Sequence, residues 1–66
     1  MRLTKTLILD TTESLVIKKG FEGTTLSDVA KHLNVTHAAL YKYYSNKEQI
    51  FEQLSLRWIE KMFKDL

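Results

Sequence analysis

The strongest constraint on how this chain can fold is the segment Thr24–Lys47, where a helix-ending residue separates two short helical patterns. Apolar residues recur at helical spacing over 26–33 and again over 37–44. Asn34 lies between them, and asparagine tolerates the left-handed backbone that a helix C-cap requires. The pattern predicts two helices joined by a tight turn. The inward-facing residues are expected to be Val29, Ala30 and Leu33 in the first helix and Leu40 and Tyr44 in the second.

Capping residues mark the start of both helices. Thr25 precedes the first, and Asp28 stands three residues later, which is the spacing of a capping box. Thr36 is in position to cap the second helix. Two helices connected in this way form a helix-turn-helix, the arrangement in which the second helix is laid in the major groove of DNA.

The outer surface of the predicted second helix suits contact with DNA. Two alanines, Ala38 and Ala39, would let its backbone approach a surface closely, and an alanine methyl can pack on a thymine methyl. Taken singly, these residues are explained equally well as helix-forming alanines and ordinary surface aromatics, whereas their combination favours DNA. The outward or lateral residues are expected to be His37, Ala38, Ala39, Tyr41, Lys42 and Tyr43.

The composition is that of one small all-helical domain. The chain has 66 residues, of which 44% are hydrophobic and 27% charged, and it contains no proline. No stretch shows the alternation of a strand, so we expect an all-α fold. The absence of cysteine excludes disulfides and thiolate metal sites and fits a reducing compartment. Because no apolar run is long enough for a membrane span, we expect a cytoplasmic location and no membrane partner.

The positions of the charged residues are more informative than the formal net charge of +2, which permits nucleic-acid binding without requiring it. Within Thr24–Lys47, Asp28 is the one acidic residue. Arg2 and Lys5 lie near the start of the first helix, where positive charge is unfavourable. Solubility is the simpler explanation for either residue alone, and a nearby phosphate is the alternative. The basic residues of the central segment are Lys31, Lys42 and Lys47.

A longer helix is predicted over 4–19. Lysines in its last turn suit the helix dipole, and Gly20 follows as a C-cap glycine. Phe21 is expected to fold back as the central plug of the core, and Glu22–Gly23 to form a turn. The apolar stripe of this helix is expected to be Ile8, Leu9, Thr12, Leu15 and Val16.

A fourth helix is predicted over 46–66, with Ser45 and Glu48 at capping-box spacing. Lys47 in its first turn is unfavourable for the helix dipole, which suggests a phosphate ligand at this helix N-terminus. One apolar stripe is expected to cover the core, and nothing in this chain covers the other. The stripes are Ile50, Phe51, Leu54 and Trp58, and Leu56, Ile59, Met62, Phe63 and Leu66.

We therefore expect two parts: a three-helix, homeodomain-like helix-turn-helix domain over 1–45, and a fourth helix over 46–66. Because the predicted fourth helix reaches Leu66 without a cap and carries an uncovered apolar face, we expect this chain to be the N-terminal part of a longer protein.

These segments resemble the DNA-binding domain of the tetracycline-repressor (TetR) family. The resemblance covers about residues 8–51 and is carried by GFEGTTLSDVAKHLNV and THAALYKYYSNKEQIF. The chain has Asn34 where the family commonly has Gly, Tyr44 where it favours Phe, and Thr12 where it commonly has Ala. None of these departures lies on the proposed DNA surface.

The resemblance implies a dimeric transcriptional regulator, usually a repressor, that binds a palindromic double-stranded operator. It also implies release by a small-molecule effector, bound to a regulatory domain that follows the fourth helix. Thr25, Tyr41 and Lys47 match positions that generally hold phosphates in the family. The positions that match base-reading or groove-facing residues are Thr36, His37, Ala38, Ala39, Lys42 and Tyr43.

Two other functions are compatible with the sequence. The chain could be a protein-interaction module that uses the second apolar stripe of its last helix, or a regulator of another helix-turn-helix family. An enzyme is not expected, because no nucleophile–base pair or phosphate-cradling glycine loop is present. His32 and His37 are the only histidines, and the helix break between them gives poor metal spacing, so we expect no metal and no cofactor.

Overall fold

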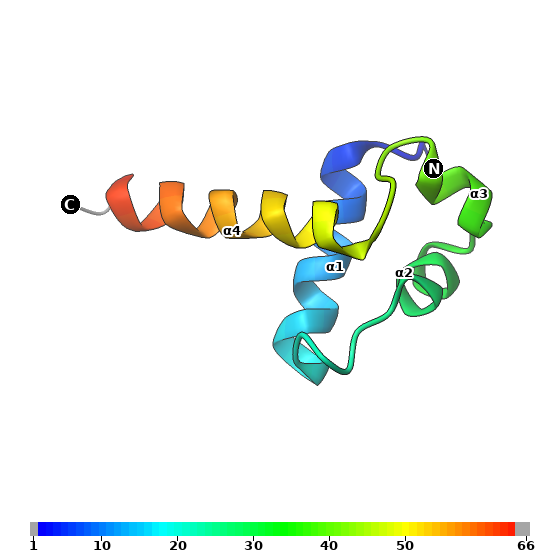
Figure 1. Cartoon of the computed structure of the whole chain (residues 1–66), viewed down its shortest axis with the longest axis horizontal. Coiled ribbons are helices and arrows are strands. Elements are labelled where there is room, and N and C mark those ends of the chain that lie inside the picture. Colours follow the sequence, from blue (N-terminus) through cyan, green and yellow to red (C-terminus); the bar gives the residue numbers. More distant parts are fainter. Residues whose placement is uncertain (1, 65–66) are drawn as a thin grey trace.

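The computed structural model describes residues 2–64 and is all helical over that range. Helix α1 spans Lys5–Lys19, α2 Leu26–Leu33, α3 His37–Tyr41 and α4 Lys47–Lys64 (Figure 1). The first three helices cluster together, and α4 extends away from them, which gives overall dimensions of 39 × 23 × 21 Å. The expected all-α architecture, with a helix-turn-helix and a long fourth helix, is confirmed. Within the described residues, no helix is long and apolar enough to cross a membrane.

Helix α1 begins one residue later than predicted because Thr4 is its N-cap. The Thr4 hydroxyl accepts a hydrogen bond from the amide of Leu7 at 3.1 Å. At the other end, the amide of Gly20 donates to the carbonyl oxygen of Val16 at 2.7 Å. Gly20 has φ 82° and ψ 164°, a conformation that is essentially restricted to glycine. The predicted C-cap glycine is therefore confirmed.

The turn between α1 and α2 buries Thr24 and leaves Phe21 outside, so the prediction that Phe21 plugs the core is wrong. The Thr24 side chain is 1% exposed, and its hydroxyl donates to the carbonyl of Gly20 at 2.8 Å. Phe21 is 48% exposed and lies against Phe51, with ring centroids 3.8 Å apart. Because Thr24 takes the inner position of this turn, Phe21 remains at the edge of the bundle.

The turn between α2 and α3 has the predicted left-handed residue. Asn34 has φ 57° and ψ 46°, and its amide donates to the carbonyl of Lys31 at 3.1 Å. The next amide, that of Val35, donates to the carbonyl of Ala30 at 3.0 Å. These two bonds form a Schellman motif, in which apolar residues on either side of the turn also pack together. The motif fixes the direction in which the chain enters α3.

Helix α3 ends at Tyr41, three residues before its predicted end at 44. The amides of Tyr43 and Tyr44 still donate to the carbonyl of Leu40, at 2.9 and 3.0 Å, so the backbone continues for one irregular turn. Leu40 and Tyr44 are 1% and 5% exposed, as predicted, although only Leu40 lies in the helix. The helix stops early because the chain must leave the helical path to begin α4.

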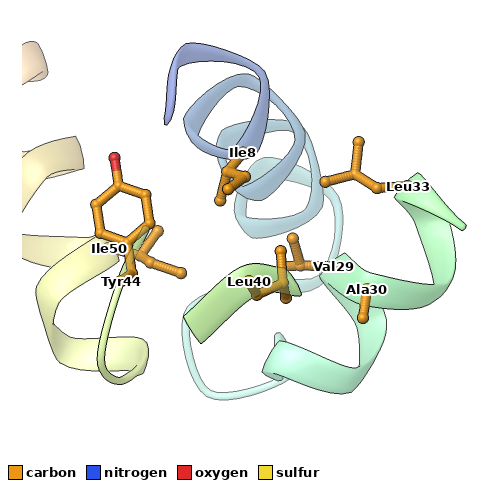
Figure 2. Packing of buried hydrophobic residues seen from close by; sticks show 7 residues of the cluster. All are labelled: Ile8, Val29, Ala30, Leu33, Leu40, Tyr44 and Ile50. Carbon is orange, nitrogen blue, oxygen red and sulfur yellow. The ribbon is translucent and has the colours of Figure 1, made fainter. Parts of the chain in front are cut away.

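Every helix contributes apolar residues to the core, and α2 contributes the three residues Val29, Ala30 and Leu33 (Figure 2). Ile8 of α1, Val29 of α2 and Leu40 of α3 are each at most 1% exposed, as is Ile50 of α4. Full burial of a side chain of this size contributes about 1.5–3 kcal/mol to folding. Thr12 is also buried, and its hydroxyl donates to the Ile8 carbonyl at 2.7 Å, so this polar residue is satisfied inside the core.

Helix α4 is capped by Asn46, so the predicted cap at Ser45 with Glu48 is wrong by one residue. The Asn46 side-chain oxygen accepts from the amide of Gln49 at 2.9 Å. The Gln49 side chain in turn accepts from the amide of Ser45 at 2.8 Å. Asparagine is as good an N-cap as serine, and its longer side chain reaches the third amide of the helix from here.

The two apolar stripes of α4 are found largely as predicted. Ile50, Phe51 and Leu54 are buried, whereas Trp58 is 38% exposed and does not belong to the core. Trp58 lies one turn beyond Leu54, where its ring nitrogen donates to Glu13 of α1. The second stripe is solvent-exposed over Leu56, Ile59, Met62 and Phe63, and its predicted member Leu66 lies outside the described residues.

Polar side chains join α4 to α1 beyond the core. The Arg57 guanidinium donates to Asp10 at 2.8 Å and to Glu13 at 3.3 Å. All three side chains are partly exposed to solvent. Exposed ion pairs of this kind contribute about 0–1 kcal/mol each, so apolar packing in the first half of α4 is the stronger attachment.

We predict that the left-handed turn depends on the identity of Asn34. Asn34→Ala should lower the free energy of unfolding by about 1 kcal/mol, because a Cβ-bearing residue without a local side-chain hydrogen bond is strained there. Asn34→Gly should leave it nearly unchanged. Urea unfolding of the three proteins measures this difference. Equal stability of the alanine and glycine variants would contradict it.

The capping box of α2 predicts a pH dependence of stability. The backbone hydrogen bond from Thr25 and the bond to Lys19 lower the pKa of Asp28 below its usual value of 3.8. A lowered pKa in the folded state stabilises the protein above the unfolded pKa, and this contribution disappears as the pH falls through the folded pKa. We expect urea unfolding to show lower stability below about pH 4, with a smaller decrease in Asp28→Asn. An equal decrease in both proteins would contradict the assignment.

Candidate nucleic-acid interface

Helix α3 presents its polar side to solvent because Leu40 holds the opposite side in the core. His37, Ala38 and Lys42 are exposed, and Ala39 is half-buried. Thr36 caps the helix, as predicted, by accepting from the amide of Ala39 at 3.2 Å. The hydroxyl proton of an N-cap threonine is not used in that bond, so Thr36 can still donate to a ligand. The small Ala38 and Ala39 side chains at the start of the helix allow close approach of another molecule.

Ser27 of α2 connects the two helices of the motif on their outer side. Its hydroxyl lies 3.1 Å from Nε2 of His37. The His37 ring in turn meets Tyr41 edge to face, with ring centroids 6.3 Å apart. Ser27 is not among the residues predicted from the sequence, where its one signal is a polar position in the first turn of α2. These contacts bring Tyr41 and His37 into one row with the start of α2.

Thr25 is the N-cap of α2 and bonds to Asp28. Its hydroxyl oxygen accepts from the amide of Asp28 at 3.1 Å, and its own amide donates to the Asp28 carboxylate at 3.0 Å, which confirms the predicted capping box. The Asp28 carboxylate also pairs with Lys19 at 3.2 Å. The bond from the Asp28 amide does not use the Thr25 hydroxyl proton, and a phosphate oxygen is a suitable acceptor for such a proton.

Lys47 is held at the start of α4 by two aromatic rings. Its ammonium lies 4.9 Å from the ring centroid of Phe21 and 5.4 Å from that of Phe51. Because Phe21 belongs to the turn before α2, these contacts place the Lys47 charge beside that turn. An ammonium beside aromatic rings keeps its positive charge, so it can also attract an anion. The structure thus brings Lys47 toward the same region as Thr25.

Tyr43 differs from the other predicted groove residues because its hydroxyl is already bonded within the protein. It donates to the carbonyl oxygen of Leu3 at 3.0 Å, across 40 positions of sequence. Tyr43 is half-buried, just after the end of α3. Its neighbour Tyr44 lies in the core, and burial raises the pKa of the Tyr44 phenol.

The arrangement is suited to binding and lacks the parts of a metal centre. Among residues 2–64 no group of three or more His, Asp or Glu side chains could hold a metal ion. A short exposed helix, a sharp preceding turn and hydroxyl and ammonium donors on both sides together define a helix-turn-helix DNA-binding domain.

The model of bacterial regulatory proteins of the tetR family matches residues 8–54, which is more than half of the chain. The chain therefore belongs to this family of transcriptional regulators.

Curated relatives of this chain are also described as transcriptional regulators. A protein of Staphylococcus epidermidis described as the biofilm operon icaADBC HTH-type negative transcriptional regulator IcaR is 43% identical over 49 residues. The proteins of that name from Staphylococcus aureus strains Newman and COL show the same identity over the same length. The match covers 74% of this chain and 26% of each relative. The chain thus spans about a quarter of the length of these relatives.

We predict that Lys47 contributes to DNA binding without regard to sequence. Lys47→Ala should weaken binding to a selected duplex and to a random duplex by similar factors, because a phosphate carries no sequence information. It should also lower the slope of log K against log salt by about 0.9, the value for one phosphate contact. Lys64→Ala at the far end of α4 is the matched control and should change neither quantity. A loss confined to the selected duplex would contradict the prediction.

Proposed function

We propose that this chain binds double-stranded DNA sequence-specifically through α3, as the DNA-binding domain of a transcriptional repressor. The observation that carries the proposal is the exposed side of α3, with His37, Ala38 and Tyr41, opposite the buried Leu40. The Asn34 turn sets the direction of the helix. Membership of the family also supports the placement of α3 in the major groove, because the second helix of a helix-turn-helix lies there.

The residues of α3 and its two caps, Thr36 and Lys42, have distinct chemical roles in this proposal. The Lys42 ammonium can donate to guanine O6 and N7, and His37 can donate or accept through the ring nitrogen that does not face Ser27. Ala38 and Ala39 allow close approach of the backbone and contact with a thymine methyl. Thr36 donates its free hydroxyl proton to a base edge or to the adjacent backbone.

Phosphates on both sides of the groove are bound by Thr25, Tyr41 and Lys47. These donors come from the start of α2, the end of α3 and the start of α4, so they can hold the backbone at separate points. Such contacts set the register of a protein on DNA, and the base contacts then decide which sequence is preferred. Tyr41 is 50% exposed, which leaves its hydroxyl accessible to a phosphate oxygen.

For the whole protein we infer a homodimer that binds a palindromic operator and is released by a small-molecule effector. The relatives are described as negative regulators, which supports repression, and they are about three times as long as this chain. We infer that a regulatory domain follows α4 in the whole protein. The exposed apolar face of α4, from Leu56 to Phe63, would pack against that domain. Two-fold symmetry would then place two α3 helices about 34–36 Å apart, or at a multiple of that distance. A cytoplasmic location stays a prediction.

The exposed face of α4 also fits a second function, a protein-interaction module that does not bind DNA. A mobility-shift assay at two salt concentrations separates the two proposals, because phosphate-dominated binding weakens steeply with salt. A protein that fails to shift any duplex at low salt would favour the interaction module.

Selection of preferred sites from random duplexes tests the role of α3. We expect His37→Ala and Lys42→Ala to change the preferred sequence, because each good base contact contributes about 1–3 kcal/mol of discrimination. Ala38→Glu should abolish binding by steric clash and repulsion from phosphates. Ser55→Glu makes the same change in charge on an exposed position of α4 and should retain the wild-type preference. An unchanged selected sequence in both alanine variants would remove α3 as the reader.

A further inference from the structure

The N-terminal segment, residues 2–4, is attached to the end of the recognition helix α3. The Leu3 carbonyl accepts from the Tyr43 hydroxyl at 3.0 Å, and the Leu3 side chain packs against the core cluster. The ammonium of the next basic residue, Lys5, lies 5.6 Å from the ring centroid of Tyr44. Figure 1 shows the start of the chain beside α3. Residues at opposite ends of the domain therefore meet next to the proposed DNA surface.

The Tyr43 hydroxyl has only one proton, and that proton is donated to Leu3. It cannot be donated to a phosphate or a base acceptor at the same time. Tyr43 must therefore contribute to DNA binding mainly by holding the N-terminal segment through Leu3. We propose that Tyr43 is a positioning residue, which holds the N-terminal segment against α3 so that Arg2 binds a DNA phosphate beside the groove that α3 occupies.

Arg2 is the suitable ligand in this segment. It is exposed, and none of the ion pairs formed within residues 2–64 includes it. Lys5 instead lies over Tyr44 and lines a surface hollow together with Glu52. A guanidinium presents parallel N–H donors that match two phosphate oxygens. A bound phosphate would also offset the unfavourable placement of Arg2 near the N-terminus of α1.

This inference rests on the proposed function, because it assigns a further contact to the same DNA complex. A tethered segment loses less conformational freedom on binding than a free one. The Tyr43–Leu3 bond should therefore increase the affinity for DNA only in a protein whose residue 2 is an arginine that binds the phosphate. We therefore expect the effects of Tyr43 and Arg2 on the free energy of DNA binding to be coupled, although only Arg2 contacts the phosphate. Coupling of this kind is measured by a double-mutant cycle.

The experiment measures binding of the protein to its selected duplex and to a random duplex over a range of salt concentrations. Arg2→Gln should weaken both by about tenfold, the scale of one hydrogen bond to a charged group, and lower the salt slope by about 0.9. Arg2→Lys keeps the charge and should restore the slope. Tyr43→Phe should weaken binding by about threefold in the wild type and have no effect in Arg2→Gln.

Tyr41→Phe is the matched control, since it removes a phenol hydroxyl that the inference does not link to residues 2–4. Its effect should multiply independently with that of Arg2→Gln. Independent effects of Tyr43→Phe and Arg2→Gln would overturn the positioning role. An unchanged salt slope or an altered base preference in Arg2→Gln would overturn the phosphate contact. If the wild-type protein showed no salt-dependent binding to either duplex, the proposed function and this inference would both be overturned.

A second measurement tests the attachment in the absence of DNA. Trypsin should cleave after Arg2 faster in Tyr43→Phe than in the wild type, because the segment is released from α3. The rate should be unchanged in Tyr41→Phe. Mass spectrometry resolves this site from cleavage after Lys5. Equal rates in Tyr43→Phe and the wild type, with both proteins folded by circular dichroism, would overturn the attachment.

Discussion

The burial of one leucine determines where α3, the helix proposed to face DNA, lies. Of the five residues described in α3, only Leu40 is buried, and a helix of this length is not stable alone in water. Leu40 packs among core residues that include Ile8 and Val29, while the Asn34 turn and the Thr36 cap define the start of the helix. The recognition surface is therefore a product of tertiary packing on α1 and α2, and changes to that packing move it directly.

The residues that begin the helices also supply the proposed ligands without chemical conflict. Thr25 and Thr36 use hydroxyl lone pairs to cap α2 and α3, and these capping bonds do not use the hydroxyl protons. Thr24 is the contrasting case, since its proton goes to the carbonyl of Gly20 and its side chain is buried. Adjacent threonines thus have separate tasks, one inside the α1–α2 turn and the other on the surface.

Helix α4 is attached strongly at one end and weakly along the rest. Ile50, Phe51 and Leu54 are buried against the other helices, whereas the next turn is joined to α1 by the partly exposed Arg57 and Trp58 contacts. Apolar burial of several residues outweighs exposed ion pairs by several kcal/mol. A force applied to the second half of α4 would therefore act on the whole DNA-binding unit through its first half.

The sequence by itself determined the all-α class, the α2 boundaries, the caps at Thr25 and Thr36, the C-caps at Gly20 and Asn34 and most of the core. These features depend on spacing and on local hydrogen bonding, which the order of residues specifies. Only the tertiary structure decided that Phe21 stays outside, that α3 ends at Tyr41, that Trp58 leaves the core and that Tyr43 bonds Leu3. Each of these depends on distant segments competing for the same space or the same hydrogen-bonding group, and spacing along the chain contains no record of that competition.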